Sequence, residues 1–370
     1  MLPAPFAPLR RRDWLRAAAA ALALPGAAAW ALPPRTIVFP RDFGSHPDLR
    51  TEWWYITGHV RASAQLYGFQ VTFFRSRVDA ARDMRSELAA RQLVFAHAAL
   101  TDLGGHKLYH DQRIARAGLG IAEAATHDTA IHLRDWSLVR VSAPGSRYTA
   151  HIETQDFGLD LTLQATQPPL LQGAQGLSRK GPEPEQASYY YSEPQLAVSG
   201  SLMLRGQRLT IDDAPAPANR AWMDHEWSEA LMHPEAVGWD WIGMNLDDGS
   251  ALTAFRLRRA DGSTVWTGGS LRKSGSSAVQ VFANASVRFT AQRTWTSSSS
   301  RAVYPVHWHI ATPAGDFAVR ALLDDQELDS RSSTGAIYWE GLCDLLDAQG
   351  SRVGRGYLEM TGYANRLQLN

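Results

Sequence analysis

Short runs that alternate apolar and polar residues restrict the fold of this 370-residue chain more than any other feature. Tyr67, Phe69, Val71 and Phe73, for example, alternate with smaller or more polar residues. Because successive side chains of a strand point to opposite faces, such a run predicts a strand with one buried face. Only residues 80–90, with Asp79 as the N-cap, predict a helix. We therefore predict an all-β fold.

Turn signals divide these runs into hairpins and into two halves. The apolar runs 239–246 and 251–258 are each followed by an Asp-Gly pair, which is typical of successive antiparallel hairpins. Residues 211–218 combine paired aspartates with two prolines, a composition that resists both helix and central strand. We place a domain boundary there, giving an N-terminal domain of residues 32–210 and a C-terminal domain of residues 211–370. Each half opens with a tryptophan-rich strand, which favours two tandem antiparallel β-barrels.

The first 31 residues have the features of an export signal. Arginines at positions 10–12 and 16 precede an alanine- and leucine-rich run, and Ala29 and Ala31 fit an A-x-A cleavage site. The order RRDWL at residues 11–15 favours the twin-arginine route over an ordinary secretory signal. The apolar run is shorter than the ~20 residues that span a bilayer, so we expect no transmembrane segment in the mature chain. The predicted location is periplasmic or secreted.

Charge and cysteine content narrow the possible partners. The chain has 37 basic and 37 acidic residues, and without residues 1–31 it has 33 basic and 36 acidic ones. A domain so close to neutral offers no electrostatic surface for nucleic acid. Cys343 is the single cysteine, which excludes an intramolecular disulfide. Stability must therefore come from the apolar core.

The segment 222–241 holds four of the 13 tryptophans together with several ionisable residues. Tryptophan is costly to bury unless its indole N–H has a partner, and a carboxylate is costly to bury unless it is paired. Their interleaving predicts a cavity with aromatic walls into which a few ionisable groups point. Such a cavity suits an apolar ligand and could deliver a proton to it.

Several motifs, in order, resemble the AttH/carotenoid 1,2-hydratase (hydroxyneurosporene synthase) family from about residue 40 to residue 365. The motifs are TEWWYITG at 51–58, GFQVTFFR at 68–75, AHAALTD at 96–102, YYYS at 189–192, AWMDHEWS at 221–228, GWDW at 238–241, YWEG at 338–341 and GYLEMTGY at 356–363.

The resemblance implies two tandem lipocalin-like antiparallel β-barrels in an exported protein. Some members are encoded beside ABC-type transporters, and some hydrate carotenoids or other terpenoids. Asp224, His225 and Trp227 match the hydratase Asp-His-x-Trp element, so they are the candidate catalytic residues. The hydratases also carry a Tyr-x-Asp element on the following strand, whereas residues 254–258 here read AFRLR. That departure argues against carotenoid hydration, and Glu226-Trp227 and residues 246–249 (LDDG) resemble the AttH branch more closely.

The chemistry of alkene hydration assigns further roles. Protonation of carbon needs a strong acid in a dry site, and the carbocation needs a negative or π-rich surface. Asp224 or protonated His225 could supply the proton, and Glu226 or Glu340 could orient the water. The predicted ligand-binding residues are Trp222, Glu226, Trp239, Trp241, Tyr191, Trp339, Glu340 and Glu359. Capping of strand ends and hydrogen bonding to indole N–H groups are the structural alternatives for Asp224 and Glu226.

Other motifs carry weaker signals. His307 and His309 share a strand face at a spacing that can chelate zinc, but His225 or Glu359 could be the third ligand only if the fold brought it close, so we expect neither a metal nor another cofactor. Ser228 lacks the Gly-x-Ser-x-Gly setting of a serine hydrolase. We expect Glu52, Trp53 and Trp54 to close the end of the first barrel, with Arg75 paired to Glu52 or stacked on an indole.

Three functions from different classes remain open. The first is a periplasmic carrier of an isoprenoid or lipid, because a small barrel can hold one such ligand. The second is a cofactor-free hydro-lyase that adds water to a terpenoid double bond. The third is an accessory protein of an ABC-type transporter, which predicts an exposed apolar patch instead of a closed cavity.

Overall fold

The computed structural model describes residues 32–86, 88–142, 145–214, 217–230 and 232–367; the predicted signal peptide, residues 1–31, lies outside them. Two antiparallel sheets account for most of this part of the chain, which confirms the all-β prediction. Two single 3₁₀ turns interrupt them, η1 (Arg41–Phe43) and η2 (Asp79–Ala81). None of the helices in the described part is long and apolar enough to cross a membrane.

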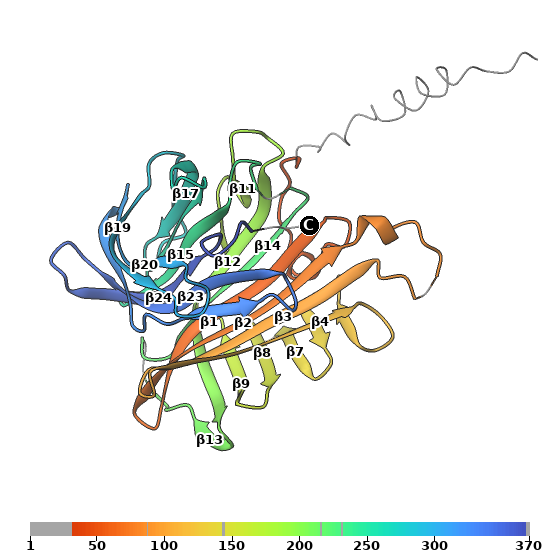
Figure 1. Cartoon of the computed structure of the whole chain (residues 1–370), viewed down its shortest axis with the longest axis horizontal. Coiled ribbons are helices and arrows are strands. Elements are labelled where there is room, and N and C mark those ends of the chain that lie inside the picture. Colours follow the sequence, from red (N-terminus) through yellow and green to blue (C-terminus); the bar gives the residue numbers. More distant parts are fainter. Residues whose placement is uncertain (1–31, 87, 143–144, 215–216, 231, 368–370) are drawn as a thin grey trace, which may run out of the picture.

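Sheet A forms a nearly closed barrel (Figure 1). Its strands run in the order β4-β3-β2-β1-β14-β12-β9-β8-β7-β6-β5, and β5 and β6 at one edge come back into contact with β3. The strands are β1 (Thr51–Ala62), β2 (Gln65–Arg77), β3 (Gln92–Asp102), β4 (Lys107–Arg116), β5 (Ala122–Ala124), β6 (Ala130–Leu133), β7 (Trp136–Ser142), β8 (Ser146–Glu153), β9 (Phe157–Gln164), β12 (Ala187–Leu204) and β14 (Arg220–Ser228), with the short β10 (Leu170–Leu171), β11 (Leu177–Arg179) and β13 (Gln207–Thr210) paired to β12.

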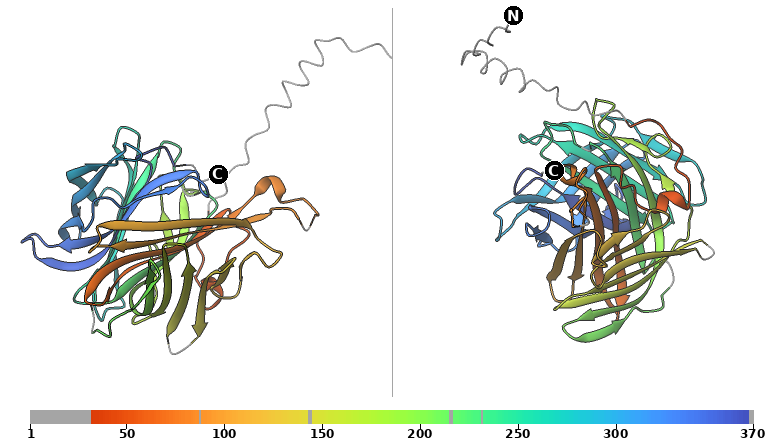
Figure 2. Two further views of the ribbon diagram at one scale, coloured as in Figure 1. Left: turned by 60° about the horizontal axis from the view of Figure 1, so that its bottom comes forward. Right: turned by 90° about the vertical axis from the view of Figure 1, so that its right-hand side faces the viewer.

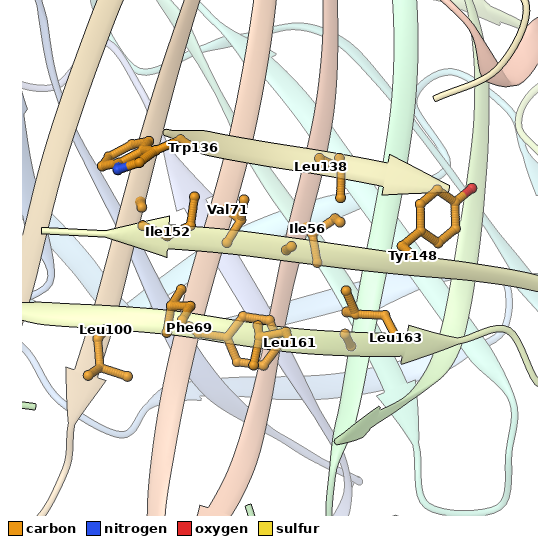
Figure 3. Packing of buried hydrophobic residues seen from close by; sticks show 14 of the residues in the cluster. Ile56, Phe69, Val71, Leu100, Trp136, Leu138, Tyr148, Ile152, Leu161 and Leu163 are labelled. Atoms are coloured by element: carbon orange, nitrogen blue, oxygen red, sulfur yellow. The ribbon is translucent and has the colours of Figure 1, made fainter. Parts of the chain in front are cut away.

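Apolar side chains fill the interior of this barrel. Strands β7–β9 cross over β1–β3, and side chains such as Phe69, Trp136 and Leu161 meet between the two walls (Figure 3). All three are almost completely buried. This core exists because each strand turns every second residue inward, as the alternation in the sequence predicts.

Sheet B encloses a second core around Trp308, Trp339 and Leu358. Its order is β18-β17-β16-β15-β24-β23-β21-β20-β19. The strands are β15 (Gly238–Leu246), β16 (Ala251–Arg258), β17 (Thr264–Arg272), β18 (Val279–Phe282), β19 (Arg288–Thr296), β20 (Val303–Thr312), β21 (Gly315–Ala321), β23 (Ala336–Leu346) and β24 (Arg352–Met360), with β22 (Glu327–Ser330) paired to β23.

The two sheets pack against each other through their outer faces. Strands β1, β2 and β14 of sheet A contact β24, β23 and β15 of sheet B, and in Figure 2 the blue C-terminal strands lie against the orange N-terminal strands. A third apolar cluster lies between them, with Tyr55 and Trp222 from sheet A and Trp241, Leu342 and Tyr357 from sheet B. The contact therefore buries side chains that an isolated barrel would expose.

The change from one sheet to the other comes between Ser228 and Gly238 and not near residue 210. β14 inserts between β1 and β12, so the second predicted domain begins with a strand that belongs to the first sheet. The composition of residues 211–218 does mark a connection, but one between two strands of sheet A.

Local predictions had mixed outcomes. Both Asp-Gly pairs form the expected hairpins, β15–β16 and β16–β17, where Gly249 and Gly262 have positive φ values of 89° and 83°. The predicted helix 80–90 is wrong, because only Asp79–Ala81 form a 3₁₀ turn. The Asp79 carboxylate does not cap this turn and instead accepts a 2.7 Å hydrogen bond from Arg77 Nε.

Candidate functional site

A cavity of about 250 Å³ lies between the outer face of sheet A and the facing strands of sheet B. Its walls come from β1–β4, β12 and β14 on one side and from β15, β16, β23 and β24 on the other. Aromatic rings form much of the lining, namely Trp53, Tyr55, Phe74, Phe95, Tyr190, Trp239, Trp241, Phe255 and Tyr338. A cavity with such walls excludes water from most of its surface and suits an apolar ligand.

Strand β14 separates the three predicted catalytic residues. Asp224 points into the cavity, whereas His225 and Trp227 point to the opposite face and pack at the end of the first barrel. Neighbouring residues of a strand always diverge in this way, so Asp224 and His225 cannot act on one ligand as a unit. The structure corrects that prediction.

The predicted ligand-binding residues divide in the same manner. Glu226, Trp239, Trp241, Glu340 and Glu359 line the cavity together with Asp224. Three others do not line the cavity. Trp339 lies in the core of sheet B, Tyr191 lies beside His225, and Trp222 donates a hydrogen bond to Asp224. Half-exposed His307 and His309 lie on β20, away from the cavity.

Asp224 is held in place by three donors. Trp222 Nε1 and Ser192 Oγ bind its Oδ1 at 2.7 and 2.5 Å, and Tyr190 OH binds its Oδ2 at 2.7 Å. Burial raises the pKa of Asp224 to about 7, although these three hydrogen bonds favour the ionised form. The side chain is therefore fixed in position but titrates near neutral pH.

Glu340 and Glu359 form a second pair of carboxyl groups. They are directly opposite each other on β23 and β24, so like charges would meet there if both were ionised. Burial raises the pKa of Glu359 to about 7, and burial together with the nearby Glu359 raises that of Glu340 far above its usual range. Burial and the nearby Glu359 thus both favour the protonated form of Glu340.

The two glutamates have different partners. Trp239 Nε1 binds Glu359 Oε2 at 2.9 Å, and Gln70 Nε2 binds Glu340 Oε2 at 2.9 Å. Glu340 Oε1 is buried and has no hydrogen bond of ordinary geometry among the described residues. Glu340 therefore has a buried carboxyl oxygen whose hydrogen-bonding capacity is unused.

Four further lining residues escaped the sequence analysis: Tyr55, Gln70, Lys180 and Tyr338. Lys180 Nζ lies 3.0 Å from Glu226 Oε1 and offsets one of the four buried carboxyl groups. Three of the four belong to motifs that the family resemblance rests on, and alternation would have placed Tyr55 on the face of Trp53. Lys180 lies in an irregular loop, where no alternation in the sequence indicates which way the side chain points.

A separate buried cluster surrounds Glu52 at the end of the first barrel. Glu52 Oε2 accepts hydrogen bonds from Arg75 Nε at 2.8 Å and from the His46 backbone N–H at 2.8 Å. Its Oε1 lies 2.7 Å from His46 Nδ1 and 2.9 Å from His225 Nε2. The predicted Glu52–Arg75 pair is thus confirmed. Burial by itself would raise the pKa of Glu52, but hydrogen bonds from His225 and His46 hold this pKa far below its usual range.

His46, Glu52 and His225 also offer three ligand atoms within 4.8 Å of one another, which could hold a metal ion. The separations of 2.7 and 2.9 Å are, however, hydrogen-bond lengths, and metal–ligand bonds of ~2.0–2.1 Å would hold tetrahedral ligands about 3.3 Å apart. The Arg75 guanidinium already neutralises the carboxylate. The geometry accordingly fits a hydrogen-bonded network that fastens residues 42–46 to the barrel.

We predict that His225→Ala lowers the free energy of unfolding by about 2–4 kcal/mol, because it leaves a buried carboxylate without one of its donors. The folded fraction should still bind an apolar dye in the cavity, since His225 does not reach it. Urea unfolding and dye titration measure the two effects. His132→Ala, at a half-buried position on β6, is the control; loss of dye binding without loss of stability would contradict the assignment.

The raised pKa of Glu359 predicts a pH dependence of stability. Between its ordinary value of 4.5 and about 7, the folded state binds more protons than the unfolded chain, so stability falls as pH rises through this window. Glu359→Gln should reduce this fall by about 2–3 kcal/mol. Urea unfolding at pH 5 to 8 tests this prediction, with the exposed Glu123→Gln as control. If the free energy of unfolding varied with pH in the same way in the wild type and in Glu359→Gln, the prediction would be refuted.

Comparison with known proteins agrees with the resemblance that the motifs show. The sequence matches the AttH-like family model over residues 30–363, whereas none of the curated proteins compared with it matches. It is similar to the crystal structure of an AttH protein from Nitrosomonas europaea, with 45% identity over 90% of this chain and 99% of that one and a TM-score of 0.81.

A more distant likeness concerns the fold alone. Kievitone hydratase from Nectria haematococca is 17% identical over 90% of this chain and 98% of that one, with a TM-score of 0.65. The family model covers nearly the whole described chain, including both sheets and the cavity between them. The chain belongs to the AttH-like family.

Proposed function

We propose that this protein binds an apolar, isoprenoid- or lipid-like ligand between its two sheets and adds water to a double bond of that ligand by acid catalysis. The observation that carries the proposal is a pair of facing carboxyl groups, Glu340 and Glu359, in an aromatic cavity, where Glu340 Oε1 has no hydrogen bond to the described residues and burial favours its protonated form. The shared fold with kievitone hydratase supports it. No cofactor is needed for this chemistry.

Each carboxyl group would have a distinct part in the reaction. Glu340 gives its proton to an alkene carbon, which forms a C–H bond and leaves a carbocation at the neighbouring carbon. The rings of Trp53 and Trp239 and the carboxylate of Asp224 stabilise that cation, with cation–π attraction of roughly 0.5–2 kcal/mol per ring. Water then adds to the cation and loses a proton to Glu359, which returns it to Glu340. The net reaction converts the alkene and one water into an alcohol.

This assignment differs from that made on the sequence alone. His225 was a candidate proton donor, but it faces the barrel end, and burial lowers its pKa to about 4. Glu340 was expected to orient water and now supplies the proton, because its pKa is raised and its Oε1 is free. Two carboxyl groups in unlike surroundings divide the acid and base roles, a pattern common in enzymes.

A carrier without catalysis is the second candidate. It would use the same aromatic cavity but would need none of the carboxyl groups. Four buried carboxyl groups would lower the stability of a carrier without contributing to ligand binding, which favours the enzyme. The carrier and the hydro-lyase are separated by the fate of the ligand after binding.

We predict that Glu340→Gln lowers hydration at least about 100-fold and leaves ligand binding within a factor of about three. The purified protein is incubated with farnesene, farnesol and geranylgeraniol in ¹⁸O-labelled water, and products that have gained one water are measured by mass spectrometry. Glu123→Gln serves as control. Binding by the wild-type protein without any hydrated product would establish the carrier instead.

We further propose export to the periplasm, with an ABC-type transporter as a possible partner; the support is the sequence of residues 1–31 and the family resemblance alone. The mature protein from the producing cells should begin near Leu32, which N-terminal sequencing determines. An intact N-terminus in the cytoplasmic fraction would refute export.

A further inference from the structure

Three buried polar atoms around the cavity have no hydrogen bond of ordinary geometry among the described residues: Tyr55 OH, Gln70 Oε1 and Glu340 Oε1. Tyr55 and Glu340 are nevertheless close enough to interact with each other. Their side chains come from β1, β2 and β23, so both sheets contribute. The residues are only 6%, 2% and 3% exposed, respectively. A buried polar atom without a hydrogen bond costs about 1–3 kcal/mol, so three in one place indicate a site that a ligand completes.

Hydrogen bonds on the far side of Glu340 fix the orientation of the groups in this site. Gln112 Nε2 donates to the Asp329 carbonyl at 2.6 Å, so Gln112 Oε1 is left to accept from Ser333 Oγ at 2.6 Å. Ser333 Oγ must then accept from His97 Nε2, which lies 2.9 Å away. His97 is therefore the Nε2–H tautomer, and its Nδ1 is an acceptor.

This chain of hydrogen bonds, the relay, continues from His97 through Tyr338 to Gln70. Because His97 Nδ1 accepts, Tyr338 OH donates to it across 2.8 Å, and Tyr338 oxygen in turn accepts from Gln70 Nε2 at 3.3 Å. Burial lowers the pKa of His97 to about 3, which keeps the ring neutral and the direction of the relay constant. Gln70 Nε2 has two hydrogens for three acceptors, so Glu340 Oε2 at 2.9 Å, Thr72 Oγ1 at 3.0 Å and, more weakly, the Tyr338 oxygen share them.

The amide of Gln70 is thus surrounded by oxygens on its nitrogen side only. Reversing it would turn the amide hydrogens away from these oxygens and leave the Tyr338 oxygen without its donor. Gln70 Oε1 consequently stays an acceptor that is open to a ligand, while Tyr55 OH and the protonated Glu340 are donors. A group that both donates and accepts matches this set.

We propose that the ligand of this cavity carries a hydroxyl group, which donates to Gln70 Oε1 and accepts from Tyr55 or Glu340, while the rest of the molecule is apolar. This inference rests on the proposed ligand-binding function and names the class of ligand. A carbonyl would leave Gln70 Oε1 without a donor, and an anion would meet the carboxyl groups of Glu340 and Glu359. A pure hydrocarbon would leave all three polar atoms unpaired.

His97 is a positioning residue in this arrangement. It does not need to touch the hydroxyl group, because it acts through Tyr338 on the orientation of Gln70. Its ring also packs against Tyr338 and Phe74, so His97→Phe keeps an aromatic ring there and removes only the hydrogen bonds. That change should weaken discrimination between ligands without weakening apolar binding.

Farnesol and farnesene form a matched pair that tests the proposal, because they share an isoprenoid chain and differ by the hydroxyl group. Each competes with Nile red for the full-length protein, and the two dissociation constants are compared. The wild-type protein should prefer farnesol by at least about tenfold. Gln70→Leu should abolish the preference by weakening farnesol binding, and His97→Phe should reduce it, whereas His132→Phe should leave it unchanged.

The possible results separate this proposal from the proposed function. Equal affinity of the wild-type protein for farnesol and farnesene would overturn the hydroxyl site, since the three atoms would then hold water, and would leave apolar ligand binding intact. Failure of both compounds to displace Nile red would overturn the isoprenoid ligand and the hydroxyl site together. A preference that persists in Gln70→Leu would place the hydroxyl elsewhere and refute the site.

Discussion

The two faces of strand β14 decide the organisation of the whole molecule. Because successive side chains of a strand diverge, Asp224 and Glu226 face the second sheet, while His225 and Trp227 seal the end of the first barrel. One short segment therefore serves as barrel wall and as cavity wall. The pairing of β14 between β1 and β12 holds both faces in register.

Burial of charge has opposite consequences on these two faces. Glu52, on the barrel side, meets the guanidinium of Arg75 and two imidazoles, so it stays ionised in spite of complete burial. Glu340 and Glu359, on the cavity side, meet each other and no cation, so burial favours their protonated forms. The first arrangement stabilises the fold, and the second creates an acid in an apolar cavity. Lys180 offsets only Glu226.

The proposed ligand site lies outside the first barrel. Its interior is filled by side chains such as Phe69, Trp136 and Leu161, and the chain before β1 covers its end through Phe43. The space for a ligand lies instead where two sheets meet with aromatic side chains on their outer faces. The cavity needs both sheets, because its hydrogen bonds join them: Gln70 of sheet A donates to Glu340 of sheet B.

The sequence by itself determined the all-β fold, the Asp-Gly hairpins, the family and six of the residues that line the cavity, because alternation, turn chemistry and motif order are local properties. Alternation would also have separated Asp224 from His225, had it been applied to residues 220–228. Only the tertiary structure decided that β14 belongs to the first sheet and that Tyr55, Gln70 and Lys180 meet the glutamates. Those contacts join residues more than a hundred positions apart or lie in an irregular loop. Hydrogen bonding and desolvation there depend on the packing of two complete sheets, which no local pattern records.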